Sequence, residues 1–246
     1  MKYKDYGKEH AKTVILLHGG GLSWWNYRKE AELLSGRFHV ILPVLDGHAG
    51  SDRNFSSIER SAREIIALID KRLGGSVDMI CGLSLGGQIL LEMLAQRGDI
   101  CRHAMIESAM AFPSKMTGAM VRPAVKCYPL TKQKWFAKLQ FASLRMEKDL
   151  FPDYYRDTRA MNKDDLTAIL KANASYRMKD TVKDCTADVH IYCGTKEVRG
   201  IRRSAKRIHK AIPASKLTKL PGMYHGEFSL NLPAFYANEV RRICQE

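Results

Sequence analysis

The sequence has no long hydrophobic run, which argues against a protein with membrane-spanning helices. No stretch of its 246 residues approaches the roughly 18 consecutive apolar residues that a membrane-spanning helix needs. The first ten residues, MKYKDYGKEH, are polar and lack the apolar core of a signal peptide. We therefore expect a cytoplasmic protein that does not insert into a membrane.

Cysteine is scarce, and its spacing does not suit a metal site. The six cysteines form no CxxC or CxxH pair. Disulfide frameworks belong mainly to small secreted chains, and this chain is longer. We predict free thiols, no metal ion and no cofactor.

Acidic residues are too few to balance the basic ones. The 40 Lys and Arg exceed the 26 Asp and Glu by 14. Residues 111–185 hold fifteen basic and eight acidic residues, which is +7 of that excess. Such a surface is most simply a solvated face, although it also favours anionic substrates or loose attraction to membranes or nucleic acid. No zinc-finger or RNP-type motif occurs, so we expect no specific nucleic-acid partner. The oligomeric state is not indicated.

Strand-like and helix-like segments alternate along the chain. Runs rich in Val, Ile and Leu predict strands at residues 13–19, 38–45, 77–82, 103–108, 188–194 and 215–222. Apolar periodicity predicts helices at residues 57–73, 87–98 and 202–212. This alternation is typical of α/β proteins with a mostly parallel sheet, and strands that are apolar on both faces need helices on both sides.

Residues 110–185 interrupt the alternation, because they contain helical segments and no convincing strand. We interpret residues 1–109 and 186–246 as one core domain and residues 110–185 as a helical insertion between two of its strands. The length is within the usual range for a single domain with one large core.

A serine flanked by glycines stands where a predicted strand meets a helix. GLSLGG, residues 82–87, contains the pattern G-x-S-x-G, which is weak by composition but strong in this position. A nucleophilic serine there needs a sharp, strained turn, and glycine neighbours leave room for it. The N–H groups that open the next helix favour a nearby oxyanion. Ser84 is the candidate nucleophile.

A second glycine-rich turn, His-Gly-Gly-Gly, follows the first long strand. Acyl transfer needs two backbone donors for the developing oxyanion. We assign these donors to the N–H groups of Leu85 and Gly20, and we take Gly21 as a candidate pocket residue. His18 is interpreted as a structural loop residue.

With these motifs the chain resembles α/β-hydrolase-fold serine hydrolases, esterase- or lipase-like members with a helical cap, over nearly its full length. HGGG, GLSLGG, the insertion and MYHGEF occur in the family's order. DGHAGS, residues 46–51, resembles the family's Gly-His loop, but the usual Asp-x-Pro is Val44–Leu45–Asp46 here, and Asp46 is assigned a structural role. The resemblance implies that residues 110–185 form a cap over the site.

The resemblance also implies the order Ser, acid, His for a catalytic triad. His225 follows the last predicted strand and is the expected base. His190 lies within a strand and is expected to be packed, while His209 lies on a basic helix and is expected to be exposed.

The expected acid is Glu197, which follows the preceding predicted strand in GTKEVRG. A carboxylate there would hold the tautomer of His225 and stabilise its imidazolium form. The family more often has Asp at this point. Glu107, after the strand that follows the serine helix, is the main alternative, and Asp188 is a weaker one.

Together these residues predict a serine hydrolase that cleaves a carboxylic ester of a small molecule through an acyl-enzyme on Ser84. A thioesterase, a lactonase, a C–C bond hydrolase or a triad-dependent lyase would use the same triad, and the fold also serves as a small-molecule receptor. One of Trp24 and Trp25 is expected to border the cleft and the other to pack inside. Six further apolar residues are weaker pocket candidates: Met110, Phe112, Met116, Trp135, Phe136 and Phe141.

Overall fold

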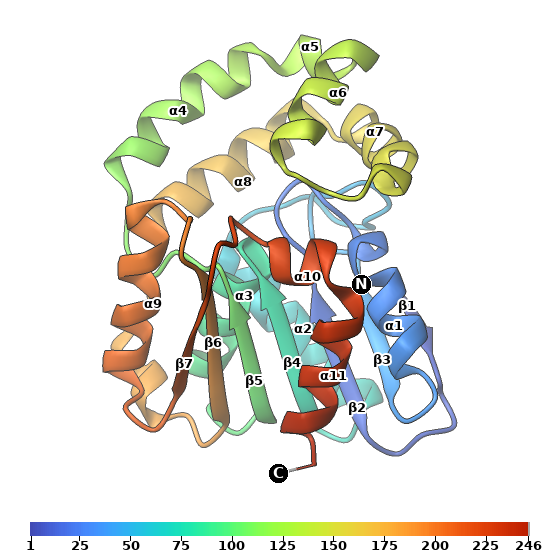
Figure 1. The fold of residues 1–246 in the computed structure, drawn as a ribbon, viewed down its shortest axis with the longest axis vertical. Helices are drawn as coiled ribbons and strands as arrows, with labels where there is room; N and C mark the ends of the chain where they lie inside the picture. Colours follow the sequence, from blue (N-terminus) through green and yellow to red (C-terminus); the bar gives the residue numbers. More distant parts are fainter. Residues whose placement is uncertain (246) are drawn as a thin grey trace.

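A computed structural model describes residues 1–245 and shows a single sheet with helices on both faces (Figure 1). Seven strands follow the order β1-β3-β2-β4-β5-β6-β7, and β1 alone among them is antiparallel to its neighbour. Their bounds are β1 Tyr3–Tyr6, β2 Thr13–Leu17, β3 His39–Pro43, β4 Val77–Leu83, β5 Cys101–Glu107, β6 Asp188–Gly194 and β7 Lys216–Leu220. The predicted α/β class and the six predicted strands are confirmed.

The edge strand β1 is the strand that the sequence did not reveal. Its four residues, YKDY, are only partly buried or exposed, so it has no apolar run. It forms because its backbone pairs with β3, with Tyr3 opposite Pro43 and Tyr6 opposite Val40. An edge strand with one neighbour needs little apolar surface, and periodicity therefore misses it.

Helices cover both faces because the central strands are apolar on both. All five residues of β2 are buried. On one face of the sheet lie α2 (Ile58–Arg72), α3 (Leu85–Gln96) and α9 (Arg199–Ala211). On the other face lie α1 (Arg28–Leu34), α10 (Glu227–Asn231) and α11 (Pro233–Ile243), in front of the sheet in Figure 1.

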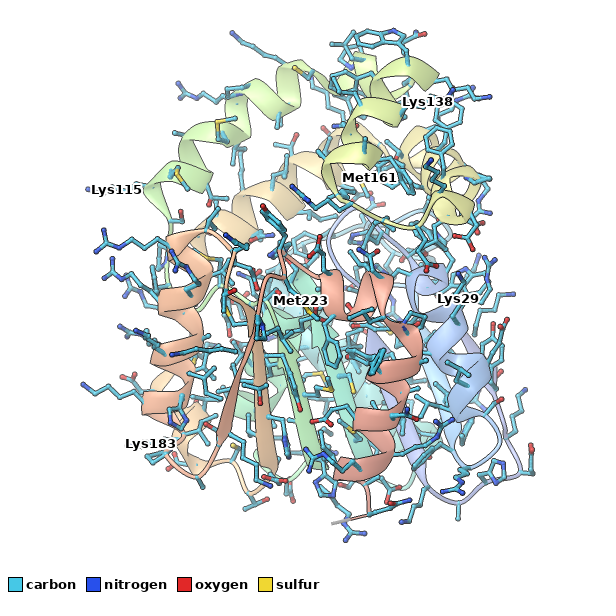
Figure 2. The ribbon with its side chains drawn as sticks, viewed as in Figure 1. Lys29, Lys115, Lys138, Met161, Lys183 and Met223 are labelled. Carbon is cyan, nitrogen blue, oxygen red and sulfur yellow. The ribbon has the colours of Figure 1, made fainter. Side chains whose placement is uncertain are left out.

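Between β5 and β6 the chain forms helices and turns. The helices are α4 (Lys115–Lys126), α5 (Tyr128–Thr131), α6 (Lys134–Ser143), α7 (Phe151–Ala160) and α8 (Lys163–Ser175). They lie above the carboxyl edge of the parallel strands, at the end of the molecule opposite the C-terminus (Figure 1). Side chains from α4 to α8 point both outwards and towards the sheet (Figure 2).

Acidic side chains of the inserted helices bind them to the core. The Trp25 indole N–H donates to Asp157 Oδ2 at 2.7 Å, and the Phe55 backbone N–H donates to Asp165 Oδ1 at 2.7 Å. Arg28 pairs with Asp153 at 2.6 Å. Asp157 and Asp165 are buried, so these contacts fix α7 and α8 over the sheet.

Close packing at the serine turn predicts a large effect for one methyl group. A Cβ on Gly86 would lie 2.2 Å from the Leu17 carbonyl oxygen and 2.8 Å from that of His18. Because both contacts are to backbone, Gly86→Ala is expected to lower the free energy of unfolding by about 1–3 kcal/mol. Urea denaturation measures this change.

Gly118 provides the matched control, because it lies in α4 with open space around its Cα. Gly118→Ala is expected to raise the free energy of unfolding by about 0.5–1 kcal/mol, since alanine is the better helix former. Equal stability of the Gly86→Ala variant and the parent protein would contradict the packing at the turn.

Candidate active site

Ser84 stands at the junction of β4 and α3 in a strained conformation. Its backbone angles are φ 52° and ψ −107°, a region that non-glycine residues rarely adopt. The strain is held by neighbouring backbone: the Ser84 N–H donates to the Glu107 carbonyl at 2.9 Å, and its own carbonyl accepts from Gln88. Strain that is fixed in this way is common at functional sites, and here it presents the hydroxyl at the end of the strand.

Ser84, His225 and Glu197 come together in a line of hydrogen-bonded side chains. His225 Nε2 lies 3.0 Å from Ser84 Oγ, and His225 Nδ1 lies 2.9 Å from Glu197 Oε2. The Glu197 side chain is fully buried, whereas 46% of the His225 side chain is exposed. The imidazole therefore bridges a buried carboxylate and a hydroxyl at the edge of solvent.

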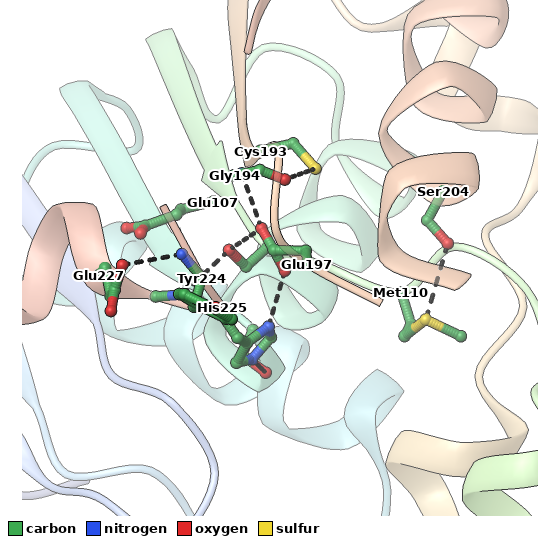
Figure 3. A network of polar contacts seen from close by, with 12 residues as sticks. Glu107, Met110, Cys193, Gly194, Glu197, Ser204, Tyr224, His225 and Glu227 are labelled. Atoms are coloured by element: carbon green, nitrogen blue, oxygen red, sulfur yellow. Dashed lines mark hydrogen bonds and ion pairs between the residues drawn. The ribbon is translucent and has the colours of Figure 1, made fainter. Parts of the chain in front are cut away.

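The surroundings of Glu197 keep its carboxylate ionised. Burial alone would raise the pKa of Glu197, but hydrogen bonds from His225, Ser108 and the Gly194 N–H outweigh burial and lower it. Ser108 Oγ donates to Glu197 Oε1 at 2.8 Å. The Gly194 N–H donates to the same oxygen at 2.9 Å (Figure 3). An ionised carboxylate with a fixed orientation can hold the Nδ1–H tautomer of His225.

Glu107, the alternative acid, makes no hydrogen bond or ion pair with His225. Its side chain is buried and accepts a long hydrogen bond, 3.4 Å, from the Ser229 N–H. Burial raises the pKa of Glu107 to about 7. Asp188, the weaker alternative, is at the start of β6, where it contacts His190 at 2.7 Å. Of the three carboxylates, only Glu197 lies against the imidazole.

Two loops that are distant in sequence must touch to assemble this line. The Lys196 N–H donates to the Met223 carbonyl at 2.9 Å, and the Thr195 N–H donates to that of Leu220 at 3.0 Å. Gly194 makes the approach possible, because a Cβ there would lie 2.2 Å from the Met223 carbonyl oxygen. The loop after β6 and the loop after β7 are thereby locked together beside Ser84.

The glycine-rich turn after β2 lies beside Ser84. The Leu85 N–H is the first of α3 and has no earlier acceptor within that helix. The Gly20 N–H makes no hydrogen bond to the residues described. The Gly21 N–H instead donates to His48 Nε2 at 3.1 Å. The N–H groups of Leu85 and Gly20, the two predicted oxyanion donors, are thus free to bind an oxyanion. The Gly21 N–H fixes the turn through its hydrogen bond to His48.

Two buried histidines fix the shape of this turn. His18 Nδ1 lies 2.9 Å from the Gly19 carbonyl, while His18 Nε2 accepts from the Leu45 N–H. Burial lowers the pKa of His18 well below its usual value and that of His48 to about 4. Both rings are therefore neutral at physiological pH, as their acceptor roles require. The DGHAGS motif in the sequence pointed to this loop but not to the role of His48.

Ser108 is a site residue that sequence reasoning missed. Besides its bond to Glu197, its Oγ accepts from the Gly226 N–H at 3.3 Å, so it connects the acid to the histidine loop. Its φ of 58° places it in the left-handed region. No sequence motif marks it, because its role depends on β5 and β6 lying side by side.

Three other polar residues named from the sequence lie away from the line formed by Ser84, His225 and Glu197. Asp46 is buried and accepts from Ser61 Oγ at 2.9 Å, and His190 is buried within β6. His209 differs from expectation: it is half-buried, and its Nδ1 contacts Ser215 Oγ at 3.0 Å. It is shielded because the end of α9 folds back onto the turn before β7.

A cavity of about 460 Å³ lies between the glycine-rich turn and the inserted helices. Gly20, Gly21 and Leu22 form its floor. Its upper wall is mainly apolar: Met120, Pro123, Ala124, Cys127, Tyr128, Phe136, Leu144, Tyr154, Met161, Leu166 and Leu170, with Thr131, Gln140, Ser143 and Thr158. Because Gly20, one of the two predicted oxyanion donors, lines it, this cavity is the candidate binding pocket.

Two pocket candidates from the sequence lie outside this cavity. The ring of Trp24 lies between Lys4 and Arg28, whose charged groups are 5.4 Å and 5.0 Å from its centroid. Phe112 lies under Arg203, 5.6 Å away. Trp25 is fully buried, and Phe136 is the single wall residue among the six weaker candidates. Sequence order placed both tryptophans near the turn but could not show which way each ring points.

Within residues 1–245, no three His, Cys, Asp or Glu side chains are grouped to hold a metal ion. All six cysteines are free thiols, as predicted. No helix in the same range is long and apolar enough to cross a bilayer.

The parallel sheet, the strained serine turn and the helices above it define a protein with the α/β-hydrolase fold. Solved structures agree. An esterase from Thermogutta terrifontis superposes with a TM-score of 0.80 at 17% identity, covering 99% of this chain and 92% of that one. An enol-lactonase from Burkholderia xenovorans gives a TM-score of 0.84 at 15% identity, covering 100% and 96%.

The sequence matches the model of the alpha/beta hydrolase family over residues 14–239, and the chain belongs to that family. The expected family is thereby confirmed. A more local similarity, 34% identity over 92 residues, links it to the magnesium-chelatase 30 kDa subunit of Rhodobacter capsulatus. That match spans 36% of this chain and about a third of the relative, 32%.

Proposed function

We propose that the protein is a serine hydrolase that cleaves a carboxylic ester through an acyl-enzyme on Ser84. One observation carries the proposal: His225 lies 3.0 Å from Ser84 Oγ and 2.9 Å from the buried Glu197 carboxylate. These distances are within the range for a nucleophile, a base and an orienting acid. Family membership supports hydrolase chemistry, and the esterase and the enol-lactonase of the same fold act on related bonds.

In the first half-reaction His225 Nε2 takes the proton of Ser84 Oγ as the oxygen attacks the ester carbonyl carbon. The negative charge that moves to the carbonyl oxygen is stabilised by the Leu85 and Gly20 N–H groups. Glu197 stabilises the imidazolium. The tetrahedral intermediate then collapses, the C–O bond to the alcohol breaks, and His225 returns its proton to the leaving oxygen.

In the second half-reaction a water molecule replaces the alcohol. His225 Nε2 takes a proton from that water as its oxygen attacks the acyl carbon, and the oxyanion is held by the same two N–H groups. Collapse breaks the bond to Ser84 Oγ, which regains the proton from His225 and releases the carboxylic acid. The 46% exposure of the His225 side chain gives water a route to the base.

The substrate class follows from the cavity above the glycine-rich turn. We propose that α4 to α8 act as a cap and that the apolar wall of the 460 Å³ cavity holds the acyl chain. Thioesters, lactones and C–C bonds beside a carbonyl are alternative substrates for the same residues. A receptor that binds a small molecule without turnover is the alternative outside catalysis.

A fluorophosphonate probe and a series of p-nitrophenyl esters from two to twelve carbons test this function. We expect covalent labelling of Ser84, located by peptide mass spectrometry, and turnover that rises with chain length until the cavity is filled. A matching series of thioesters and lactones identifies the preferred bond. Tight ligand binding with neither labelling nor turnover would show a receptor instead.

A further inference from the structure

The N-terminal half of the inserted helices carries charge of one sign only. From Ser108 to Met146 the sequence contains seven Lys or Arg and no Asp or Glu. Five of these cations make no ion pair or hydrogen bond within the described residues, and all five are exposed: Lys115, Arg122, Lys126, Lys134 and Lys138. By contrast, the acids that bind the inserted helices to the core lie on and near α7 and α8, in the second half.

Two large apolar side chains lie exposed beside the cations of α6. Trp135 is 61% exposed and Leu139 is 63% exposed. They are four residues apart, so they share one helix face. On α4 the exposed Met116 and Met120 also share one face, but Met120 lines the cavity, so that face borders the cavity and not the outer surface. A single exposed apolar residue is common, whereas a Trp and a Leu on one face of a basic helix form a small apolar patch.

On α6 the arrangement divides the helix into three faces. Ala137 and Phe141 are buried against the protein, and Phe136 and Gln140 line the cavity. Trp135 and Leu139 occupy the outer face, where Lys134 and Lys138 flank them. The outer end of the molecule therefore presents apolar side chains within a basic rim, with Lys115 and Lys138 at its two sides (Figure 2).

We propose that this outer surface, formed by Trp135 and Leu139 together with the exposed cations of α4 and α6, docks the protein onto an anionic lipid bilayer. Lys and Arg near a bilayer gain attraction from anionic headgroups, while Trp and Leu bury their apolar parts at the interface. A nucleic acid would satisfy the cations but would leave Trp135 and Leu139 in water. The mixture of charge and apolar area favours the bilayer.

The position of the surface connects docking to the cavity. Met120, Pro123 and Ala124 of α4 and Phe136 of α6 form part of the cavity wall. The two helices that would touch the bilayer thus also roof the candidate binding pocket. Resting on the proposed function, this geometry indicates an ester whose acyl chain resides in the bilayer and passes between α4 and α6.

Vesicle sedimentation tests the docking directly. We expect the full chain to bind vesicles of phosphatidylcholine with 30% phosphatidylglycerol, to bind pure phosphatidylcholine far more weakly, and to lose affinity in 1 M NaCl. Lys134→Gln with Lys138→Gln should weaken binding about 10- to 30-fold, at roughly fivefold for each cation. Trp135→Ala with Leu139→Ala should weaken it about tenfold or more.

A matched control lies on α9, which carries six Lys or Arg against two on α6 and whose large apolar residues are buried. Lys206→Gln with Lys210→Gln removes the same charge from exposed positions four residues apart on this helix. Vesicle affinity should then change by less than about threefold, since α9 lies on the side of the molecule (Figure 1). A loss equal to that of the α6 pair would overturn the proposal in favour of unspecific attraction.

Tryptophan fluorescence reports which residue enters the interface. Phosphatidylglycerol vesicles should shift the emission of the protein to the blue, and brominated lipids should quench it. Trp135→Phe should keep binding within about threefold but abolish both signals, because Trp25 is buried and Trp24 is packed between two cations. Signals that persist in Trp135→Phe would contradict the docking orientation.

Two further outcomes would overturn the proposal. The first is no binding to anionic vesicles at low salt. The second is tighter binding to duplex DNA at the same phosphate concentration, unchanged by Trp135→Ala with Leu139→Ala, which would identify a nucleic-acid surface. Fluorophosphonate labelling without vesicles measures the proposed hydrolase function alone, so docking and catalysis can fail separately.

Discussion

Replacing Ser84 by alanine is expected to lower kcat for any accepted ester by about 10⁴- to 10⁶-fold. The Ser84 hydroxyl oxygen lies 3.0 Å from Nε2 of His225, in position for attack. Without it the acyl-enzyme cannot form, although the two N–H donors and the cavity remain. Initial rates with a p-nitrophenyl ester measure the loss, and unchanged thermal unfolding shows that the fold is intact.

Ser175 offers a matched control for this variant. It is exposed at the end of α8, and its hydroxyl donates to the Lys171 carbonyl at 2.9 Å and has no histidine partner. Ser175→Ala should retain fluorophosphonate labelling and turnover within about threefold, since an exposed helix-end serine contributes little. Labelling that survived in the Ser84→Ala variant would contradict the assignment of the nucleophile.

Exchanging Glu197 for glutamine is expected to lower kcat by about 10³- to 10⁴-fold. The carboxylate accepts from His225, Ser108 and the Gly194 N–H, and an amide at that position cannot accept all three hydrogen bonds. The imidazole would then lose the tautomer and the charge stabilisation that proton transfer requires. Rates measured between pH 6 and 9 with the same ester separate a lower kcat from a shift in the pH profile.

Glu107→Gln is the control, because Glu107 is the alternative acid and its side chain is likewise buried. Its side chain makes no hydrogen bond to His225, so kcat should change by less than about tenfold. A loss as large as that of Glu197→Gln would move the role of the acid to Glu107.

The Glu107→Gln variant should also change how the free energy of unfolding depends on pH. The pKa of Glu107 is about 7 in the folded protein, against its usual 4.5 in an unfolded chain. The unfolded state therefore releases its proton first, and this carboxyl makes the fold less stable as the pH rises from 4.5 to 7. Between pH 4.5 and 8, Glu107→Gln should gain on the order of 3 kcal/mol relative to the parent protein in urea denaturation.

The uneven charge of the inserted helices bears on both proposals, the cap over the active site and the docking of its outer surface onto a bilayer. Several acids in the second half contact the core, such as Asp157 with Trp25 and Asp165 with Phe55. The first half holds no acid, so five of its seven cations are left for solvent or an external partner. The overall charge of +14 is therefore in part a local property of one end of the molecule.

The local sequence pattern was enough to predict most of the strands and to identify Ser84 and His225 as catalytic candidates. The apolar runs of β2 and β4 and the glycines around Ser84 leave few alternatives for the backbone, since Gly82 and Gly86 would each place a Cβ within 2.4 Å of backbone atoms. His225 was identified by its place after the last strand. These features depend on neighbours in sequence, which a single chain displays directly.

The choice between Glu197 and Glu107, the roles of Ser108 and His48, and the direction of the Trp24 ring were decided only by tertiary structure. Each depends on contacts between loops that lie tens of residues apart, such as Lys196 with Met223 and Gly21 with His48. The sequence shows which side chains follow a strand. It does not show the direction in which each side chain points once the neighbouring elements have packed against that strand. Packing of whole elements fixes those directions, because only the assembled fold excludes water and sets distances of about 3 Å.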